Sequence, residues 1–189
     1  MSRSDYPVLP LWVMRLFWAI ATTWCAAGFA NAQAAAPTGL EQQVRDIGQV
    51  VTGIASYIKW PASHNALQLC VTGDTRFAAT LLDGSAQARS QPMRALRLPG
   101  SPSTAFSSCD IVYVGALAVA ERRRLLQQLD GQPVLSISEP DAPCTGNIMF
   151  CLKFRDEQVA FEANLDAIGK SGLRVHPNVL QLARRKGSP

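Results

Sequence analysis

Apolar side chains recur at helical spacing in a segment that begins at Leu40. They fall mostly three or four positions apart, which places them on one face of a helix. The positions are Leu40, Val44, Ile47, Val51, Ile54, Ala55 and Ile58. Pro61 is expected to stop this helix. Segment 33–39, which is rich in small residues and shows no periodicity, is expected to be a flexible leader.

Further along the chain, short apolar runs alternate with helical patterns. Strands are predicted at 66–71, 109–114 and 133–137, and the continuous apolar character of 109–114 is typical of a buried parallel strand. Helical patterns begin at Phe77 and cover 117–129. This alternation predicts an α/β fold, in which a mainly parallel sheet is flanked by helices in a three-layer, Rossmann-like arrangement.

The pattern changes in the last fifty residues, where a hairpin signal appears. Two strand-like segments, 147–154 and 159–162, flank the polar turn 155–158, and we expect them to pair antiparallel. Short helical segments follow at 164–170 and 178–185. The sheet is therefore expected to end in a C-terminal antiparallel hairpin accompanied by short helices.

The length and composition of the chain fit one folded domain. A chain of 189 residues can bury a core of its own, and we expect a single domain over 40–186. Hydrophobic residues make up 48% and charged residues 17%, which argues against an intrinsically disordered protein. The formal net charge is +4, and basic residues cluster only at 122–124 and 184–186. These clusters are too small to indicate nucleic-acid binding.

The N-terminal residues carry the pattern of a secretory signal. Arg3 and Arg15 precede an uncharged apolar run at 16–29, and Ala30-Asn31-Ala32 has the Ala-x-Ala form that signal peptidase accepts. The run of about 14 residues is shorter than the roughly 20 that a membrane-spanning helix needs, so a retained anchor is the weaker interpretation. We expect 1–32 to be cleaved and the mature protein to be exported.

Cleavage removes Cys25 and leaves an even number of cysteines in a compartment that permits disulfides. The remaining four are Cys70, Cys109, Cys144 and Cys151. Six residues separate Cys144 from Cys151, a spacing that a turn can close, so a structural or regulatory bridge is expected there. Cys70 and Cys109 lie in predicted strands and either pair across the sheet or stay reduced, because sequence alone does not fix the pairing.

The sequence contains no recognisable catalytic or metal-binding set. No nucleotide-binding glycine motif, G-x-S-x-G elbow, H-E-x-x-H or C-x-x-C occurs, and His64 and His176 lack metal ligands at suitable spacing. The turn 72–76 could hold an anion on its backbone donors, but an ordinary capped turn is the preferred interpretation. We therefore expect no catalytic residues, metal or cofactor, and keep a thiol-dependent enzyme as a lesser alternative.

Apolar and charged side chains mix in the C-terminal region, as they do in an interface with an apolar centre and a polar rim. The apolar positions are Leu165, Ile168, Val175, Pro177 and Leu180, and Glu162, Lys170, Arg174 and His176 supply polar ones. The apolar side chains could also belong to the core. Glu162 lies in the apolar run 159–163 and could face solvent, pair with an arginine or mark a recognition surface. We predict that Glu162 and the five apolar residues bind a partner.

Six stretches of the mature chain form an ordered set of motifs. They lie at 55–61, 69–74, 109–114, 146–150, 159–165 and 172–173. The most specific are Lys-Trp-Pro at 59–61 and Phe-Glu-x-Asn-Leu at 161–165, followed by Gly-Leu at 172–173. In this order the stretches resemble the YfiR-like family over nearly the whole mature chain. The chain departs from the family pattern at 148–150, where Ile-Asn-Phe is usual, and at 176–177, where two serines are common.

The resemblance implies a periplasmic, non-enzymatic repressor. Such a protein binds the periplasmic part of an inner-membrane diguanylate cyclase of the YfiN type, which lowers cyclic-di-GMP synthesis and biofilm formation. An outer-membrane lipoprotein of the YfiB type relieves the repression by sequestering the repressor. Disulfides hold the active fold in this family, so reduction is expected to release the cyclase. We also expect a homodimer and no nucleic-acid partner.

The residues also allow a periplasmic small-ligand sensor. Its binding site would lie in the crevice at the carboxyl ends of the parallel strands, near 72–75 and Gly115. A metabolite would stabilise such a sensor against heat, whereas a regulator would co-purify with a membrane protein. The two alternatives are therefore separable by simple measurements on the purified protein and on membranes.

Overall fold

The computed structural model describes residues 38–61, 65–88, 91–99, 106 and 108–182. The expected signal peptide, most of the expected leader, His64 and the last residues of the expected domain lie outside the described residues. In the described part of the chain, no helix is long and apolar enough to cross a membrane.

The first helix, α2, spans Gly39–Ala55 and begins one residue before the predicted apolar pattern. Its N-terminus carries a capping box, in which the Thr38 hydroxyl accepts from the Glu41 N–H at 3.3 Å and the Thr38 N–H donates to Glu41 Oε2 at 3.0 Å. The helix ends before Pro61, as predicted. However, Ile58 is not helical, because it lies in the short strand β1 (Ile58–Lys59).

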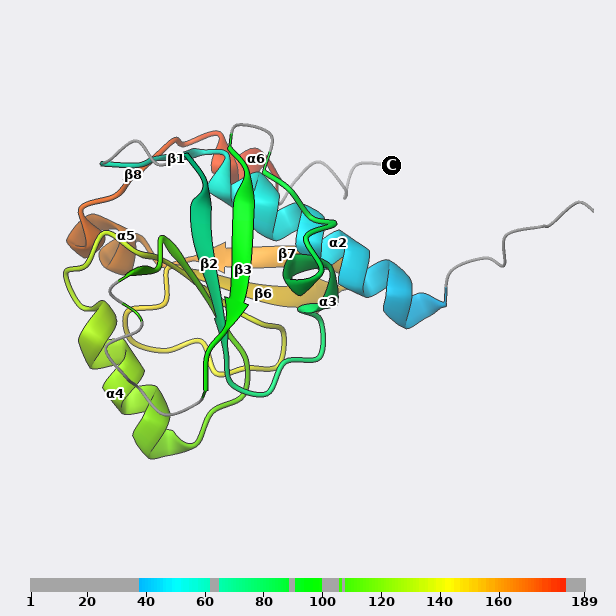
Figure 1. The fold of residues 1–189 in the computed structure, drawn as a ribbon, viewed down its shortest axis with the longest axis horizontal. Coiled ribbons are helices and arrows are strands. Elements are labelled where there is room, and N and C mark those ends of the chain that lie inside the picture. The colour runs from blue at the N-terminus through cyan, green and yellow to red at the C-terminus, as the bar shows by residue number, and fades with distance from the viewer. Residues whose placement is uncertain (1–37, 62–64, 89–90, 100–105, 107, 183–189) are drawn as a thin grey trace, which may run out of the picture. The chain divides into compact units, whose positions relative to one another are not determined.

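Six strands form one sheet in the order β3-β2-β4-β5-β6-β7 (Figure 1). Their bounds are β2 Leu67–Thr72, β3 Met93–Arg97, β4 Ile111–Val114, β5 Leu135–Ser138, β6 Phe150–Arg155 and β7 Gln158–Ala163. All pairings from β3 to β6 are parallel, and β6 and β7 pair antiparallel. The predicted α/β fold with a mainly parallel sheet and a C-terminal antiparallel hairpin is therefore confirmed.

The remaining helices are α3 (Ala79–Leu82), α4 (Val119–Leu129), α5 (Leu165–Ser171) and α6 (Val179–Leu182). Alternate residues of the central strands face two separate cores. Leu69 packs in the core that contains the buried face of α2, whereas the next residue, Cys70, packs in the core that contains Leu125 of α4. Figure 1 accordingly shows α2 and α4 on either side of β2 and β3, which is the expected three-layer arrangement.

The hairpin between β6 and β7 has a two-residue turn. Arg155 pairs with Gln158, so only Asp156 and Glu157 connect the strands. Both have positive φ, 48° and 63°, which is the backbone of the type I′ turn that matches the twist of paired strands. The predicted polar turn at 155–158 is confirmed.

A second sheet of two short strands was not predicted. β8 (Arg174–Val175) pairs antiparallel with β1, and Ile58 lies opposite Val175. The His176 N–H also donates to the Tyr57 carbonyl at 2.9 Å. These contacts bring the C-terminal segment back to the end of α2, although more than a hundred residues separate the two strands in the sequence.

Candidate partner-binding surface and its disulfide

Both disulfides are formed between the expected partners. Cys70 and Cys109 have Cα atoms 5.9 Å apart, and those of Cys144 and Cys151 are 5.7 Å apart. Cys70 and Cys109 are buried in the core under α4. Cys144 is exposed, whereas its partner Cys151 is buried in the same core. The structure therefore resolves the alternative left open for Cys70 and Cys109 in favour of a bond across the sheet.

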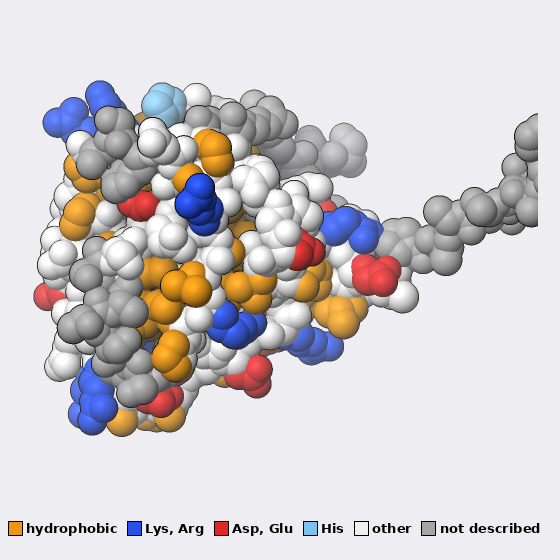
Figure 2. All heavy atoms as spheres, in the orientation of Figure 1, with side chains coloured by type: hydrophobic (Ala, Val, Ile, Leu, Met, Phe, Trp, Pro, Cys, Tyr) orange, Lys and Arg blue, Asp and Glu red, His pale blue; other side chains and the backbone are white. Residues whose placement is uncertain are grey.

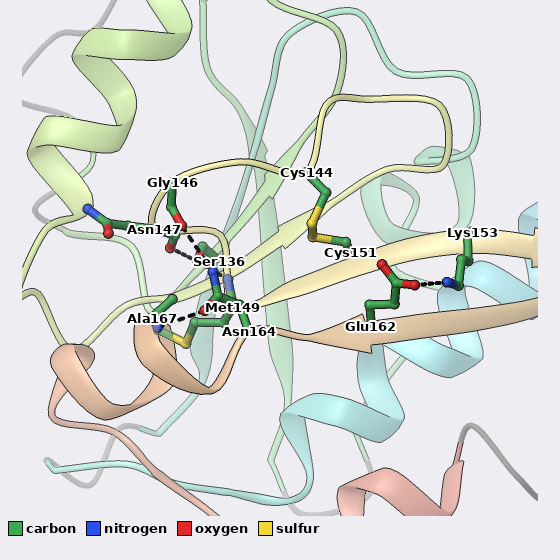
Figure 3. The surroundings of a disulfide bond; sticks show 10 residues. All are labelled: Ser136, Cys144, Gly146, Asn147, Met149, Cys151, Lys153, Glu162, Asn164 and Ala167. Atoms are coloured by element: carbon green, nitrogen blue, oxygen red, sulfur yellow. Dashed lines mark hydrogen bonds and ion pairs between the residues drawn. A yellow bond between two sulfur atoms is a disulfide. The ribbon is translucent and has the colours of Figure 1, made fainter.

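The exposed disulfide shares one face of the β6–β7 hairpin with Glu162. Cys151 on β6 lies directly opposite Glu162 on β7, and opposite residues of paired strands point to the same face. Lys153, two residues after Cys151, binds the Glu162 carboxylate on this face (Figure 3). Cys144, Cys151, Lys153 and Glu162 are called the hairpin face below.

Glu162 faces solvent, with 62% of its side chain exposed, and its cation is a lysine rather than an arginine. The hydrogen bond and the charge of Lys153 lower the pKa of the Glu162 carboxyl, with a smaller contribution from Arg155. The carboxylate is thus held ionised at the surface. Of the three possibilities considered for Glu162, solvent exposure is confirmed, whereas the pair with an arginine is replaced by one with lysine.

Hydrogen bonds fasten the segment between the two cysteines to three elements (Figure 3). The Ser136 hydroxyl of β5 donates to the Asn147 carbonyl at 2.9 Å and accepts from the Met149 N–H at 3.0 Å. Asn147 Nδ2 donates to the Leu126 carbonyl of α4 at 3.3 Å. Asn164, which caps α5, donates to the Gly146 carbonyl at 3.1 Å. The position of Cys144 is therefore coupled to α4, β5 and α5.

The structure places the predicted partner-binding residues on successive elements, and they differ in exposure. Leu165 at the start of α5 is 72% exposed and Leu180 in α6 is 47% exposed, and Pro177 is also exposed. Ile168 and Val175 are half-buried and pack against the core. Figure 1 shows α5 and α6 apart, joined through β8. The exposed leucines are thus on separate elements rather than in contact.

Apolar side chains are also exposed outside the C-terminal region. Figure 2 shows hydrophobic side chains gathered over β2 and β3, with basic and acidic side chains around them. Leu96 of β3, an edge strand of the six-stranded sheet, is half-exposed. A test of the C-terminal surface therefore needs variants of exposed leucines elsewhere as comparisons.

The crevice at the carboxyl ends of the parallel strands contains a carboxylate of the chain itself. Glu139 follows β5 directly and is 4% exposed. Its Oε1 accepts from the Phe77 N–H at 2.7 Å and from the Arg76 N–H at 3.0 Å. The Tyr113 hydroxyl donates to the same carboxylate at 3.2 Å, and burial, together with the charge of Glu139, raises the pKa of Tyr113.

This arrangement changes the interpretation of the turn at 72–76. The backbone donors at the end of that turn, which could hold an anion, are occupied by Glu139. The Asp74 N–H donates to the Ala116 carbonyl at 2.8 Å. A cavity of about 190 Å³ remains beside Glu139 and Arg76, but these donors of the turn are not free. The occupied donors at Asp74, Arg76 and Phe77 therefore agree with the preferred interpretation of an ordinary turn.

No group of three or more histidine, cysteine, aspartate or glutamate side chains in the described residues could hold a metal ion. His176 Nδ1 instead accepts from the Asn178 N–H at 3.2 Å. Its ring lies 6.2 Å from that of Tyr57. His176 therefore has a structural role at the junction between β8 and α6.

Two residues with unusual surroundings were not predicted. Glu139 directly follows a predicted strand, at the edge of the sheet where polar groups converge, and this position could have indicated its role. Arg122 is buried on α4, three positions before Leu125 and seven before Leu129. That helical spacing could have shown that its side chain faces the sheet.

A comparison with protein families gives one match over most of the domain. The model of a family described as YfiR/HmsC-like matches residues 48–184. The matched region begins within α2 and extends past α6. It contains both disulfides, the hairpin face and all the predicted partner-binding residues.

Proposed function

The chain belongs to the YfiR/HmsC-like family, and we propose that it is a periplasmic negative regulator. It binds the periplasmic part of an inner-membrane diguanylate cyclase of the YfiN type and lowers cyclic-di-GMP synthesis and biofilm formation. An outer-membrane lipoprotein of the YfiB type relieves this repression by sequestering the regulator. The observation that carries the proposal is the family match over 48–184, since members of the family are generally regulatory rather than catalytic.

The disulfides support a periplasmic location for the mature protein. Disulfides persist in the periplasm and are rare in the cytosol, where thiols are kept reduced. The described part of the chain has two of them, and the N-terminal sequence has the pattern of a signal peptide that is removed on export. The proposal therefore includes cleavage near Ala32 and export of the domain that follows.

The regulator acts by stoichiometric contact rather than by turnover. Leu165, Pro177 and Leu180 present exposed apolar side chains along the C-terminal segment, and Glu162 with Lys153 supplies charge on the neighbouring hairpin. Exposed apolar groups with a polar rim are typical of protein interfaces. We propose that the surface formed by Glu162, Leu165, Ile168, Val175, Pro177 and Leu180 contacts the cyclase or the lipoprotein, and that two copies of the chain form the active regulator.

Repression also depends on the Cys144–Cys151 disulfide. This bond fixes the segment that carries hydrogen bonds to α4, β5 and α5, next to Glu162 on the hairpin face. Its loss releases one end of that segment. The proposed consequence is a weaker regulator under reducing conditions and a more active cyclase.

Co-expression with the cyclase tests the proposal. The full chain, tagged at its C-terminus, is produced at graded levels in a bacterium that lacks its own copy and carries one YfiN-type cyclase. Cyclic-di-GMP is expected to fall in proportion to the ratio of regulator to cyclase, and the cyclase is expected to co-purify from membranes with the tagged chain. Unchanged cyclic-di-GMP together with no co-purification would contradict the function. Complete silencing by a small fraction of regulator would contradict the stoichiometric mechanism.

A further inference from the structure

A pocket lies between α4 and the segment that separates Cys144 from Cys151. It has a volume of about 360 Å³. Its walls include Arg122, Arg123, Leu126 and Asp130 of the α4 region and Thr145 and Asn147 of the segment. Figure 3 shows Asn147 directed toward α4. The pocket is separate from the predicted partner-binding residues and from the crevice that contains Glu139.

Arg122 has the most unusual surroundings in this pocket. The residue is 7% exposed, yet Nε, Nη1 and Nη2 have no hydrogen-bond partner within the described ranges of the chain. A guanidinium carries five N–H donors and a permanent positive charge. Buried charges in proteins are normally paired, because removing a charge from water without compensation is unfavourable. These nitrogens are buried as well as unpartnered, so an anion in the pocket reaches the donors of Arg122 only when the side chain turns toward it.

The helix places Arg122 where a hydrocarbon side chain would pack. The buried residues of α4 are Arg122, Leu125 and Leu129, which share the face that lies on the sheet. A leucine at position 122 would continue this apolar face without desolvating a charge. Since nothing in the packing of α4 requires a cation there, the arginine indicates a group that it binds.

The charges around the pocket favour an anion with a single charge. Arg122 and Arg123 supply two positive charges, and Asp130 supplies one negative charge. Asn147 Nδ2 donates to Asp130 Oδ1 at 3.0 Å, so this carboxylate is already engaged within the protein. The planar fork of a guanidinium matches a carboxylate, which can accept two parallel hydrogen bonds from it.

We propose that this pocket binds a small organic monocarboxylate. The carboxylate lies on the guanidinium of Arg122, and the hydrocarbon part lies against Val119 and Leu126, which supply apolar wall. The volume is within the range of small-molecule sites in proteins. This binding site does not depend on the proposed contact with a cyclase, and either can exist without the other.

Titration of the purified protein with acetate, butyrate and hexanoate at constant ionic strength tests the site. We expect saturable shifts of the backbone amide NMR signals of α4 and of residues 145–147, with affinity rising from acetate to hexanoate. Arg122→Met is expected to weaken hexanoate binding roughly tenfold or more. The same variant should not lower the Tm of the ligand-free protein, because it removes a buried unpaired charge.

Arg124→Met is the matched control, since it removes the same charge from an exposed residue of the same helix that does not line the pocket. It should leave hexanoate affinity unchanged. The proposal is wrong if no carboxylate gives a saturable shift, if both variants weaken binding equally, or if inorganic phosphate binds as tightly as hexanoate. It is also wrong if an acidic peptide binds where hexanoate does not. If Arg122→Met does not fold, Arg122→Lys is tested instead. It keeps the positive charge but lacks the planar guanidinium, and hexanoate binding is expected to weaken to the same extent.

Discussion

Glu139 shows how one side chain can join elements that are distant in the sequence. Its carboxylate accepts hydrogen bonds from two backbone N–H groups at 76 and 77 and from the Tyr113 hydroxyl. The three donors come from the turn after β2 and from β4, and Glu139 itself follows β5. A buried carboxylate with several donors is fully satisfied, so it organises the carboxyl edge of the sheet rather than offering a free charge to a ligand.

Replacing Glu139 should therefore destabilise the fold strongly. Glu139→Ala leaves two buried backbone donors and a tyrosine hydroxyl without their acceptor, and we expect a loss of about 2–4 kcal/mol in the free energy of unfolding. Urea denaturation followed by circular dichroism measures this loss. Asp141→Asn, a change at the neighbouring exposed carboxylate that tolerates the positive φ found there, should cost less than about 0.5 kcal/mol. Equal effects of the two variants would contradict the role given to Glu139.

Glu162 is the carboxylate whose ionisation is expected to depend on its partner. Lys153 lowers the pKa of Glu162 in the folded protein. Because the folded pKa lies below that of the unfolded chain, the pair contributes stability above the unfolded pKa, and this contribution is lost as the pH falls through the folded pKa. The contribution is small, since the carboxylate is at the surface.

Lys153→Met is expected to raise the pKa of Glu162 toward its ordinary value. An NMR titration of the Glu162 carboxyl carbon between pH 2 and pH 7 measures the change. Lys170→Met removes the same charge from α5, away from the ion pair, and should leave the titration of Glu162 unchanged. An unaltered pKa in the Lys153→Met variant would show that the ion pair does not form in solution.

At the scale of elements, the two disulfides have different surroundings and different spans. Cys70–Cys109 joins β2 to the entry of β4 across 39 residues and both of its cysteines are buried, whereas Cys144–Cys151 closes 7 residues between the exposed Cys144 and the buried Cys151. In the loop-entropy model, the longer loop contributes about 4 kcal/mol and the shorter one about 2.5 kcal/mol. The short disulfide is thus both more accessible and less important for global stability.

Mild reduction should open Cys144–Cys151 first. With dithiothreitol at low concentration, alkylation and peptide mass spectrometry are expected to show labelled Cys144 and Cys151 while Cys70 and Cys109 remain joined, because a thiolate must reach a sulfur to attack it. Cys144→Ser should lower the free energy of unfolding by about 2.5 kcal/mol and weaken repression of the cyclase. Labelling of Cys70 before Cys144 would contradict the order derived from exposure.

At the scale of the whole molecule, the proposed partner surface follows the C-terminal segment. The segment from β7 to α6 crosses from the edge of the main sheet to the end of α2, where β8 pairs with β1. Its exposed leucines, Leu165 and Leu180, lie on the two helices that flank β8. Ile168 packs against the core, so an aspartate there would disturb folding as well as any interface.

Leu165→Asp and Leu180→Asp are therefore the informative variants of this surface. Each is expected to reduce co-purification of the cyclase or of the lipoprotein at least fivefold, while the Tm stays within about 3 °C of wild type, because exposed positions contribute little to stability. Quantitative pull-down from membranes and thermal unfolding provide the two measurements.

Leu40→Asp is the matched control for these variants. The exposed fraction of Leu40, 44%, is similar to the 47% of Leu180. An aspartate in the first turn of α2 is compatible with the helix. This control should bind normally. If Leu40→Asp or Leu96→Asp abolishes binding and the two C-terminal variants do not, the partner surface lies on α2 or on the edge strand β3 instead.

Elements whose signal is local were predictable from the order of the residues alone. The spacing from Leu40 to Ala55 predicted α2, the continuous apolar run predicted β4, and the alternation with helices predicted the parallel sheet, because burial of one face imposes a short repeat on the chain. The turn at 155–158 and the Cys144–Cys151 bridge were also predictable, since their residues are near neighbours in the sequence.

Contacts between residues that are distant in the sequence became known only from the folded chain. The bond between Cys70 and Cys109, the pairing of β1 with β8 and the hydrogen bonds of Glu139 with its three donors join residues that are tens of positions apart. Arg122 lies on the same face of α4 as Leu125 and Leu129, and the packing of α4 on the sheet buries its guanidinium without a hydrogen-bond partner among the described residues. Local spacing cannot specify such contacts, because they form only when strands and helices that are distant in the sequence come together in the fold.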